Sequence, residues 1–122
     1  MLGHSELDSE SAGRNYKNMK VGYVYILSNL KRTTFYIGVT NNLQKRVAEH
    51  KQGVGSIFTS TYKLYYLVYF ERILSIEQAI KRETQLKNWK RSWKIDLIKS
   101  MNPKMLDLID LGLPADSESS SE

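Results

Sequence analysis

Three short runs of aromatic and β-branched residues constrain the fold of this chain more than any other feature. They are GYVYIL at 22–27, FYIGVT at 35–40 and KLYYLVYF at 63–70. Residues of these types favour β-strands. The polar segment SNLKRTT at 28–34 separates the first two runs, so these predict a β-hairpin, and the last run predicts a third strand.

Most of the remaining central sequence has residue patterns that predict helices. NNLQKRVAEHKQG at 41–53 begins with Asn, ends with Gly and carries Leu43 and Val47 four residues apart, which predicts a short helix. GVGSIFTSTY at 53–62 predicts a loop, because it contains two glycines and a run of small hydroxyl residues.

A longer helix is predicted to begin at Ser75, with Gln78 as its capping-box partner, and to continue through 76–90. A last helix over 93–101 is expected to stop before Asn102 and Pro103, since the residue before a proline disfavours helix. The order β-β-α-β-α-α predicts an α+β fold with an antiparallel sheet.

Length and charge divide the chain into one domain and two tails. A chain of 122 residues predicts a single folded domain, which we place at 19–113, with Met19 as a natural start. The segments 1–18 and 114–122 are rich in Ser and acidic residues, so we expect disordered tails. Residues 19–113 hold 16 Lys and Arg against seven Asp and Glu, a balance of +9 that favours a polyanionic partner.

Several classes of protein are not expected from this composition. The absence of cysteine excludes disulfides and thiolate metal sites and suits the cytoplasm. No apolar run approaches the ~20 residues of a membrane span, and the N-terminus has no signal-peptide pattern.

Two tyrosines and a glycine are predicted to share one face of the hairpin. Residues two apart in a strand face the same way, so Tyr23, Tyr25 and Leu27 lie together, as do Tyr36, Gly38 and Thr40. If the hairpin pairs around its polar turn, Tyr25 and Tyr36 come close together. They could be ordinary sheet aromatics, but a glycine inside a strand often marks a close backbone approach.

Arg46 and His50 lie four residues apart and therefore occupy one face of the predicted short helix. A guanidinium directs two donors onto a phosphate and stays charged at any working pH. Histidine has an ordinary pKa near neutrality, which suits proton transfer. The alternative is that both side chains are simply solvated, as we expect for Lys45, Glu49 and Lys51.

Glu83 is placed on the side of the predicted long helix that carries Ile76 and Ile80. A carboxylate there costs free energy unless it is paired or binds a metal ion. A structural ion pair is the alternative, because three cations are close in sequence: Lys81, Arg82 and Lys87.

The segment KRETQLKNWKRSWK at 81–94 combines six cations with Trp89 and Trp93. Lys and Arg neutralise phosphates, and aromatic rings stack on bases or anchor a core. We expect the tryptophans to be mostly core residues and the cations to be mostly phosphate-facing.

These residues, taken together, resemble the GIY-YIG nucleases, in particular the small stand-alone bacterial type. The similarity spans about Gly22 to Leu108 and includes several elements in the right order. In the first motif Val24 and Tyr25 hold the "IY" positions, with Tyr23 in place of the glycine. The second motif, YIG at 36–38, is intact. The family's arginine, histidine and acid then fall on three downstream residues: Arg46, His50 and Glu83.

The resemblance implies a small three-stranded antiparallel sheet flanked by helices and a metal-dependent hydrolysis of DNA phosphodiesters, directed at DNA structure rather than sequence. It implies that Glu83 holds one Mg²⁺ (or Mn²⁺) and that Arg46 stabilises the phosphate charge. It further implies a tyrosine as general base, with its pKa lowered by Arg46 and the metal. Either tyrosine could take the proton; we favour Tyr25 as the base and Tyr36 as its orienting partner, with His50 assisting the water or that tyrosine. Residues expected to contact nucleic acid are Gly38, Lys45, Lys81, Arg82, Lys87, Lys90 and Arg91.

Two positions depart from the repair members of that family. Val39 stands where those members carry a lysine, and Asn102 is only loosely matched to a structural or phosphate-contacting asparagine. The sequence therefore leaves a second hypothesis open, a nucleic-acid-binding module that keeps the fold but cleaves weakly. An adaptor that binds another protein has no positive support in the sequence.

Overall fold

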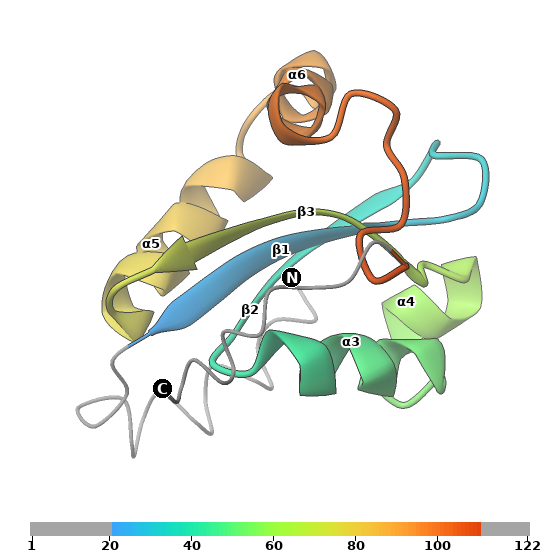
Figure 1. Ribbon diagram of the computed structural model, residues 1–122, viewed down its shortest axis with the longest axis horizontal. Coiled ribbons are helices and arrows are strands. Elements are labelled where there is room, and N and C mark those ends of the chain that lie inside the picture. Colours follow the sequence, from blue (N-terminus) through green and yellow to red (C-terminus); the bar gives the residue numbers. More distant parts are fainter. Residues whose placement is uncertain (1–20, 111–122) are drawn as a thin grey trace.

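The computed structural model describes residues 21–110, which form a sheet and helices in the order shown in Figure 1. The predicted tails at 1–18 and 114–122 lie outside the described residues. The elements are β1 (Gly22–Ser28), β2 (Phe35–Thr40), α3 (Leu43–Lys51), α4 (Ile57–Tyr62), β3 (Tyr66–Ile73), α5 (Ile76–Lys87) and α6 (Arg91–Met101). None of the helices within 21–110 is long and apolar enough to cross a membrane.

The sheet has three antiparallel strands in the order β2-β1-β3, so the first strand of the chain lies in the middle. This confirms the predicted hairpin and the α+β class. Tyr25 pairs with Gly38 on one side and with Phe70 on the other. A register shift between Ile26 and Leu27 marks an irregularity opposite β3.

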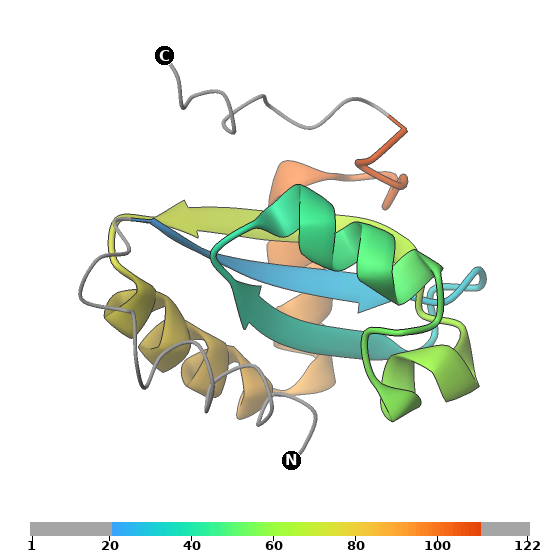
Figure 2. The ribbon, with the colours of Figure 1, turned by 90° about the horizontal axis from the view of Figure 1, so that it is seen from below.

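Strand alternation divides the core into two layers, one on each face of the sheet. Tyr23, Tyr25 and Leu27 pack with Leu43 and Val47 of α3. Val24 and Ile26 face the other way and pack against the second layer, which includes Ile76, Ala79, Leu86 and Ile98 from α5 and α6. Figure 2 shows α3 crossing in front of the sheet, with α6 behind it.

Each of three helices begins at a residue whose side chain accepts a hydrogen bond from a backbone N–H of the first turn. Asn42 caps α3, Ser56 caps α4 and Ser75 caps α5. Such caps satisfy donors that have no partner inside the helix. The sequence predicted the first and last of these helices but not α4.

Helix α4 lies inside the segment 53–62, which was predicted to be a loop, so that prediction is wrong. Its β-branched and hydroxyl residues have low helix propensity, yet the Ser56 cap and the burial of Thr59 hold six residues in a helix. Lys63, with φ of 57°, adopts the left-handed conformation that ends it.

The boundaries of two other elements also differ from the prediction. β3 begins at Tyr66 and continues to Ile73, three residues beyond the predicted end, because an edge strand can carry the polar Glu71 and Arg72. Helix α5 ends at Lys87, and α6 begins at Arg91. Trp89 packs partly buried against the core, whereas Trp93 is 49% exposed, so its expected core position is wrong.

The segment after α6 returns to the sheet through two buried polar residues. The Asn102 amide donates hydrogen bonds to Val68 O (3.0 Å) and Leu106 O (2.8 Å), and its oxygen accepts one from Leu106 N (3.1 Å). Asp107 accepts hydrogen bonds from Leu67 N (3.1 Å) and Lys51 Nζ (3.0 Å). Asn102 thus has structural contacts that tie the end of α6 to β3.

Replacing Asn102 by Ala should destabilise the fold by about 2–4 kcal/mol, because the substitution leaves several buried backbone groups without partners. Urea unfolding of the variant and the parent measures this difference. Asn88→Ala is a suitable control, since Asn88 is exposed at the end of α5. Equal loss in both variants would contradict the structural role of Asn102.

Candidate active site

The site is built around a close approach between β1 and β2. Gly38 lies opposite Tyr25, and a Cβ atom at Gly38 would come within 2.5 Å of both Cζ and Oη of Tyr25. No side chain can be accommodated there without moving the buried tyrosine. The predicted neighbours Tyr25 and Tyr36 have their ring centroids 6.3 Å apart.

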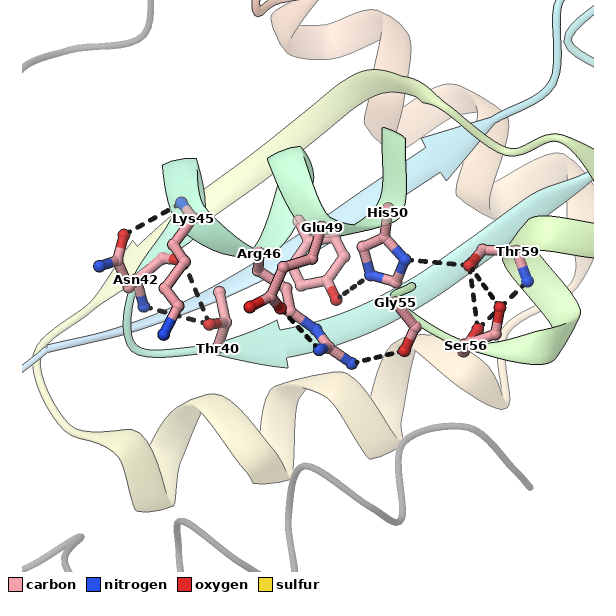
Figure 3. Close-up of polar contacts among 10 residues, drawn as sticks. Thr40, Asn42, Lys45, Arg46, Glu49, His50, Gly55, Ser56 and Thr59 are labelled. Carbon is pink, nitrogen blue, oxygen red and sulfur yellow. Dashed lines mark hydrogen bonds and ion pairs between the residues drawn. The ribbon is translucent and has the colours of Figure 1, made fainter. Parts of the chain in front are cut away.

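His50 of α3 lies against both tyrosines and is fully buried. Its Nε2 is 3.0 Å from the Tyr25 hydroxyl, and its Nδ1 is 3.0 Å from the Thr59 hydroxyl of α4. Figure 3 shows the imidazole of His50 directed at Thr59, with Ser56 next to Thr59. The centroids of His50 and Tyr36 are 5.5 Å apart.

The tautomer of His50 is coupled to the hydrogen bonds of Thr59. The Thr59 hydroxyl has one proton, and its neighbours are Ser56 O at 3.2 Å, Ser56 Oγ at 3.0 Å and His50 Nδ1 at 3.0 Å. When this proton is donated to Ser56, Thr59 accepts a hydrogen bond from a proton on His50 Nδ1. Nε2 of His50 is then an acceptor for the Tyr25 hydroxyl.

The pKa values of this pair are governed first by burial. Burial lowers the pKa of His50 to about 4, and the charge of Arg46 acts in the same direction. The expectation that this histidine titrates near neutrality is therefore wrong, and His50 is neutral at pH 7.

The pKa of Tyr25 lies above its ordinary value. Burial is the largest cause, and the negative forms of Tyr36 and Glu83 add to it, while the charge of Arg46 lowers it. Arg46 has the expected sign of influence, but it does not outweigh burial. Tyr25 is accordingly neutral at pH 7.

Arg46 of α3 is half-buried, and its side chain extends to the loop before α4. Its Nη1 donates to Glu49 Oε1 at 3.0 Å and its Nη2 donates to Gly55 O at 3.1 Å (Figure 3). Its Nε is buried and makes no hydrogen bond within residues 21–110. Such a buried donor has a cost that a further acceptor would remove. Glu49, expected to be solvated, is instead this ion-pair partner.

Three supporting residues were missed by the sequence analysis: Gly55, Ser56 and Thr59. A Cβ at Gly55 would lie 2.1 Å from His50 Nδ1, so the glycine allows the backbone to pass over the imidazole. Its carbonyl also accepts from Arg46. Serine is a preferred helix N-cap, so Ser56 could have indicated the start of α4, but not the contact of Thr59 with His50.

Glu83 of α5 is only 1% exposed and belongs to the same electrostatic cluster, as its effect on Tyr25 shows. Its Oε2 is 3.0 Å from Lys87 Nζ, and the lysine side chain is 30% exposed. Of the three cations considered as partners, Lys87 makes the ion pair. Arg82 instead forms an ion pair with Glu71, at 2.8 Å.

The other basic residues predicted to contact nucleic acid have different surroundings. Lys45 and Lys81 are exposed. Lys90 lies over the Trp93 ring at 5.4 Å, and Arg91 lies over Phe35 while donating to Thr33 O at 2.7 Å. Their roles toward nucleic acid stay predictions.

The donor set fits a hard cation held by a single carboxylate. No cluster of three or more His, Cys, Asp and Glu side chains suited to a metal occurs in the part of the chain that the structure describes. Mg²⁺ commonly binds proteins through one or two carboxylates and completes its shell with water and phosphate oxygens. Glu83 fits this mode, and the Lys87 ammonium already neutralises its oxygen.

Comparison with known proteins matches residues 21–96 to the model of the GIY-YIG catalytic domain. The chain belongs to this family. The family is one of endonucleases, and the matched range includes every residue of the site described above.

This chain is also similar to curated relatives and to a solved structure. A UPF0213 protein of Syntrophus aciditrophicus is 38% identical over 89 residues, covering 72% of this chain and all of the relative. One from Clostridium perfringens is 39% identical over 84 residues, covering 69% of this chain and 89% of the relative. The solution NMR structure of a UPF0213 protein from Bacillus halodurans has 26% identity, covers 77% of this chain and 99% of its own, and has a TM-score of 0.48.

The buried neutral His50 predicts a pH-dependent stability. Its pKa is about 4 in the fold and about 6.5 when unfolded, so the unfolded chain binds more protons between these values. The stability associated with neutral His50 is complete above pH 6.5 and is lost as pH falls toward 4, by up to about 3 kcal/mol.

Urea unfolding of the parent and of His50→Gln from pH 7.5 to pH 4.5 measures this contribution. Carboxylates titrate in both proteins, so the difference between the two curves isolates the histidine. The parent should lose more stability than the variant on acidification. Parallel curves would show that His50 is not held neutral by the fold.

Proposed function

We propose that the protein is a metal-dependent endonuclease that hydrolyses phosphodiester bonds in DNA and selects its substrate by structure rather than sequence. The observation that carries the proposal is the convergence of one set of groups at Gly38 of β2. Tyr25, Tyr36 and His50 are in mutual contact there, and the charges of Arg46 and Glu83 act on Tyr25.

In this reaction Tyr25 takes a proton from the attacking water as it gives its own to His50. The 3.0 Å hydrogen bond supports this direction: with the ring proton on Nδ1, next to Thr59, Nε2 of His50 has a free lone pair for the proton from Tyr25. A bound phosphate brings negative charge next to His50, which raises its affinity for the proton. Tyr36 holds Tyr25 and the ring of His50 in place.

Arg46 binds the phosphate and stabilises the charge that develops on it. Its buried Nε supports this role, since a phosphate oxygen would supply the missing acceptor. Preorganised donors in a site shielded from water are worth more than the same donors in bulk solvent.

Glu83 is the residue that would hold the metal ion. When bound, Mg²⁺ or Mn²⁺ would supply Lewis-acid stabilisation of phosphate charge. The Lys87 side chain would have to move away from one oxygen of Glu83 for the metal to bind there. The partial exposure of Lys87 supports such a movement.

The basic balance of residues 19–113 supports binding to a polyanion, and electrostatic contacts to phosphates carry no sequence information. The test is incubation of the full chain with labelled duplex, gapped, flapped and single-stranded DNA, and with RNA of the same forms. Each reaction is run with Mg²⁺, with Mn²⁺ and with chelator. Metal-dependent cleavage of at least one DNA structure is expected, and its absence from all of them would reject the proposal.

Glu83→Gln should abolish cleavage while leaving the free energy of unfolding within about 1 kcal/mol of the parent. Glutamine keeps the size of the side chain but loses the charge that holds the cation, and the partly exposed Lys87 can be solvated when its partner is lost. Cleavage assays and thermal melts on one preparation measure both effects.

Glu77→Gln is the matched control, because Glu77 is exposed in the first turn of the same helix. It should retain both activity and stability. If Glu83 were only a structural partner of Lys87, its variant would melt lower and keep its activity per folded molecule.

Arg46→Lys should lower the rate of cleavage at least ~10²-fold and weaken DNA binding much less, since lysine keeps the charge but not the planar set of donors. Single-turnover rates and binding in chelator separate the two quantities. Arg72→Lys, at an exposed position of β3, provides the control. Parental rates in Arg46→Lys would show that the guanidinium is not used.

A further inference from the structure

A row of three aromatic rings leads from the candidate site to the surface of α4. The centroids of Tyr36 and Phe58 are 6.2 Å apart, and those of Phe58 and Tyr62 are 4.8 Å apart. We call these three residues the aromatic row. Exposure increases along it, from 8% for Tyr36 to 40% for Phe58 and 52% for Tyr62.

The direction of the row is set by the buried side of α4. Thr59 points inward to His50, and its hydroxyl is tied to Ser56 at the start of the helix. Phe58 and Tyr62 are four residues apart and therefore share another face of the helix. The same helix thus fixes the imidazole on one side and presents two aromatic rings to solvent on another.

The charges near the row favour an anionic partner. Between Glu49 and Glu71 the sequence contains no acidic residue, and its two lysines are Lys51, which forms an ion pair with Asp107, and Lys63. Lys63 is exposed and directly follows Tyr62 at the end of α4. A partner with flat apolar faces and regularly spaced negative charges matches this combination of rings and cations.

We propose that the aromatic row is a stacking platform for an unpaired nucleobase of DNA next to the phosphodiester that is cleaved. The inference rests on the proposed endonuclease function and deepens it, since it names the substrate class. Tyr36 belongs to both parts, because its ring contacts His50 as well as Phe58.

Stacking on an aromatic side chain accepts any base, because every base has a π-face. Each stacked base is worth about tenfold or more in affinity. In a fully paired duplex the same base is already stacked and would have to leave its neighbours first. The row therefore selects gaps, flaps and single strands over intact duplex without reading sequence.

The test uses a gapped DNA duplex with one 2-aminopurine in the gap, and the same sequence fully paired. Affinity and the change in 2-aminopurine fluorescence are measured in chelator, so that no cleavage is needed for either reading. Phe58→Leu, which keeps an apolar side chain but removes the ring, should lower the affinity for gapped DNA about tenfold more than for paired DNA. It should also diminish the fluorescence change.

Phe58→Trp keeps an aromatic ring at this position and should give the parental affinity and fluorescence change. This variant, together with thermal melts of each protein, guards against a loss that is caused only by poor folding. Leu74→Ala is the control. Leu74 is also exposed and apolar, but it lies in the turn between β3 and α5, at the end of the sheet opposite α4 (Figure 1), and should change neither reading.

Equal losses for the two DNAs, or no loss in Phe58→Leu, would overturn the platform. It would also be overturned by a parent that is dimeric in gel filtration and becomes monomeric in Phe58→Leu. A parent that binds gapped DNA through Phe58 but cleaves no substrate would support the platform and reject the endonuclease function, so the two proposals fail separately.

Discussion

The hydrogen bond between Tyr25 and His50 is the interaction on which the rest of the site depends. It joins the central strand of the sheet to α3 through two fully buried side chains. Two glycines make it possible, one beneath the tyrosine ring and one over the imidazole. The burial that results keeps both groups neutral in the free protein.

The supporting contacts extend outward from this bond in two directions. Toward α4, Thr59 fixes the ring of His50, and the loop that carries Gly55 also receives a hydrogen bond from Arg46. Toward α5, the charge of Glu83 acts on Tyr25 from the opposite layer of the core. Residues from both helical layers, whose apolar contacts are separate, therefore influence the phenol of Tyr25, which lies next to Gly38 of edge strand β2.

Local patterns were enough to predict the parts of the structure that depend on near neighbours in sequence. Alternation along the hairpin predicted the proximity of Tyr25 and Tyr36, and helix caps predicted the starts of α3 and α5. The partners of charged residues were not predictable in this way. Arg82 has several acceptors within reach along its helix, but its ion pair is with Glu71, eleven residues earlier on a neighbouring strand. Likewise, nothing in IFTSTY indicates that its first threonine, Thr59, contacts His50, nine residues earlier, because that contact depends on the path of the intervening loop.

A ring proton on Nδ1 of His50, as in the proposed reaction, has a consequence for how the site changes charge. A proton that arrives at Nε2 leaves the bond from Nδ1–H to Thr59 as it was, so an imidazolium needs no new rotamer and no ring flip. The heavy atoms of the charged and uncharged states can therefore occupy the same positions. In such a site little reorganisation energy is associated with moving the proton, and the ring is ready for the next turnover as soon as the proton returns.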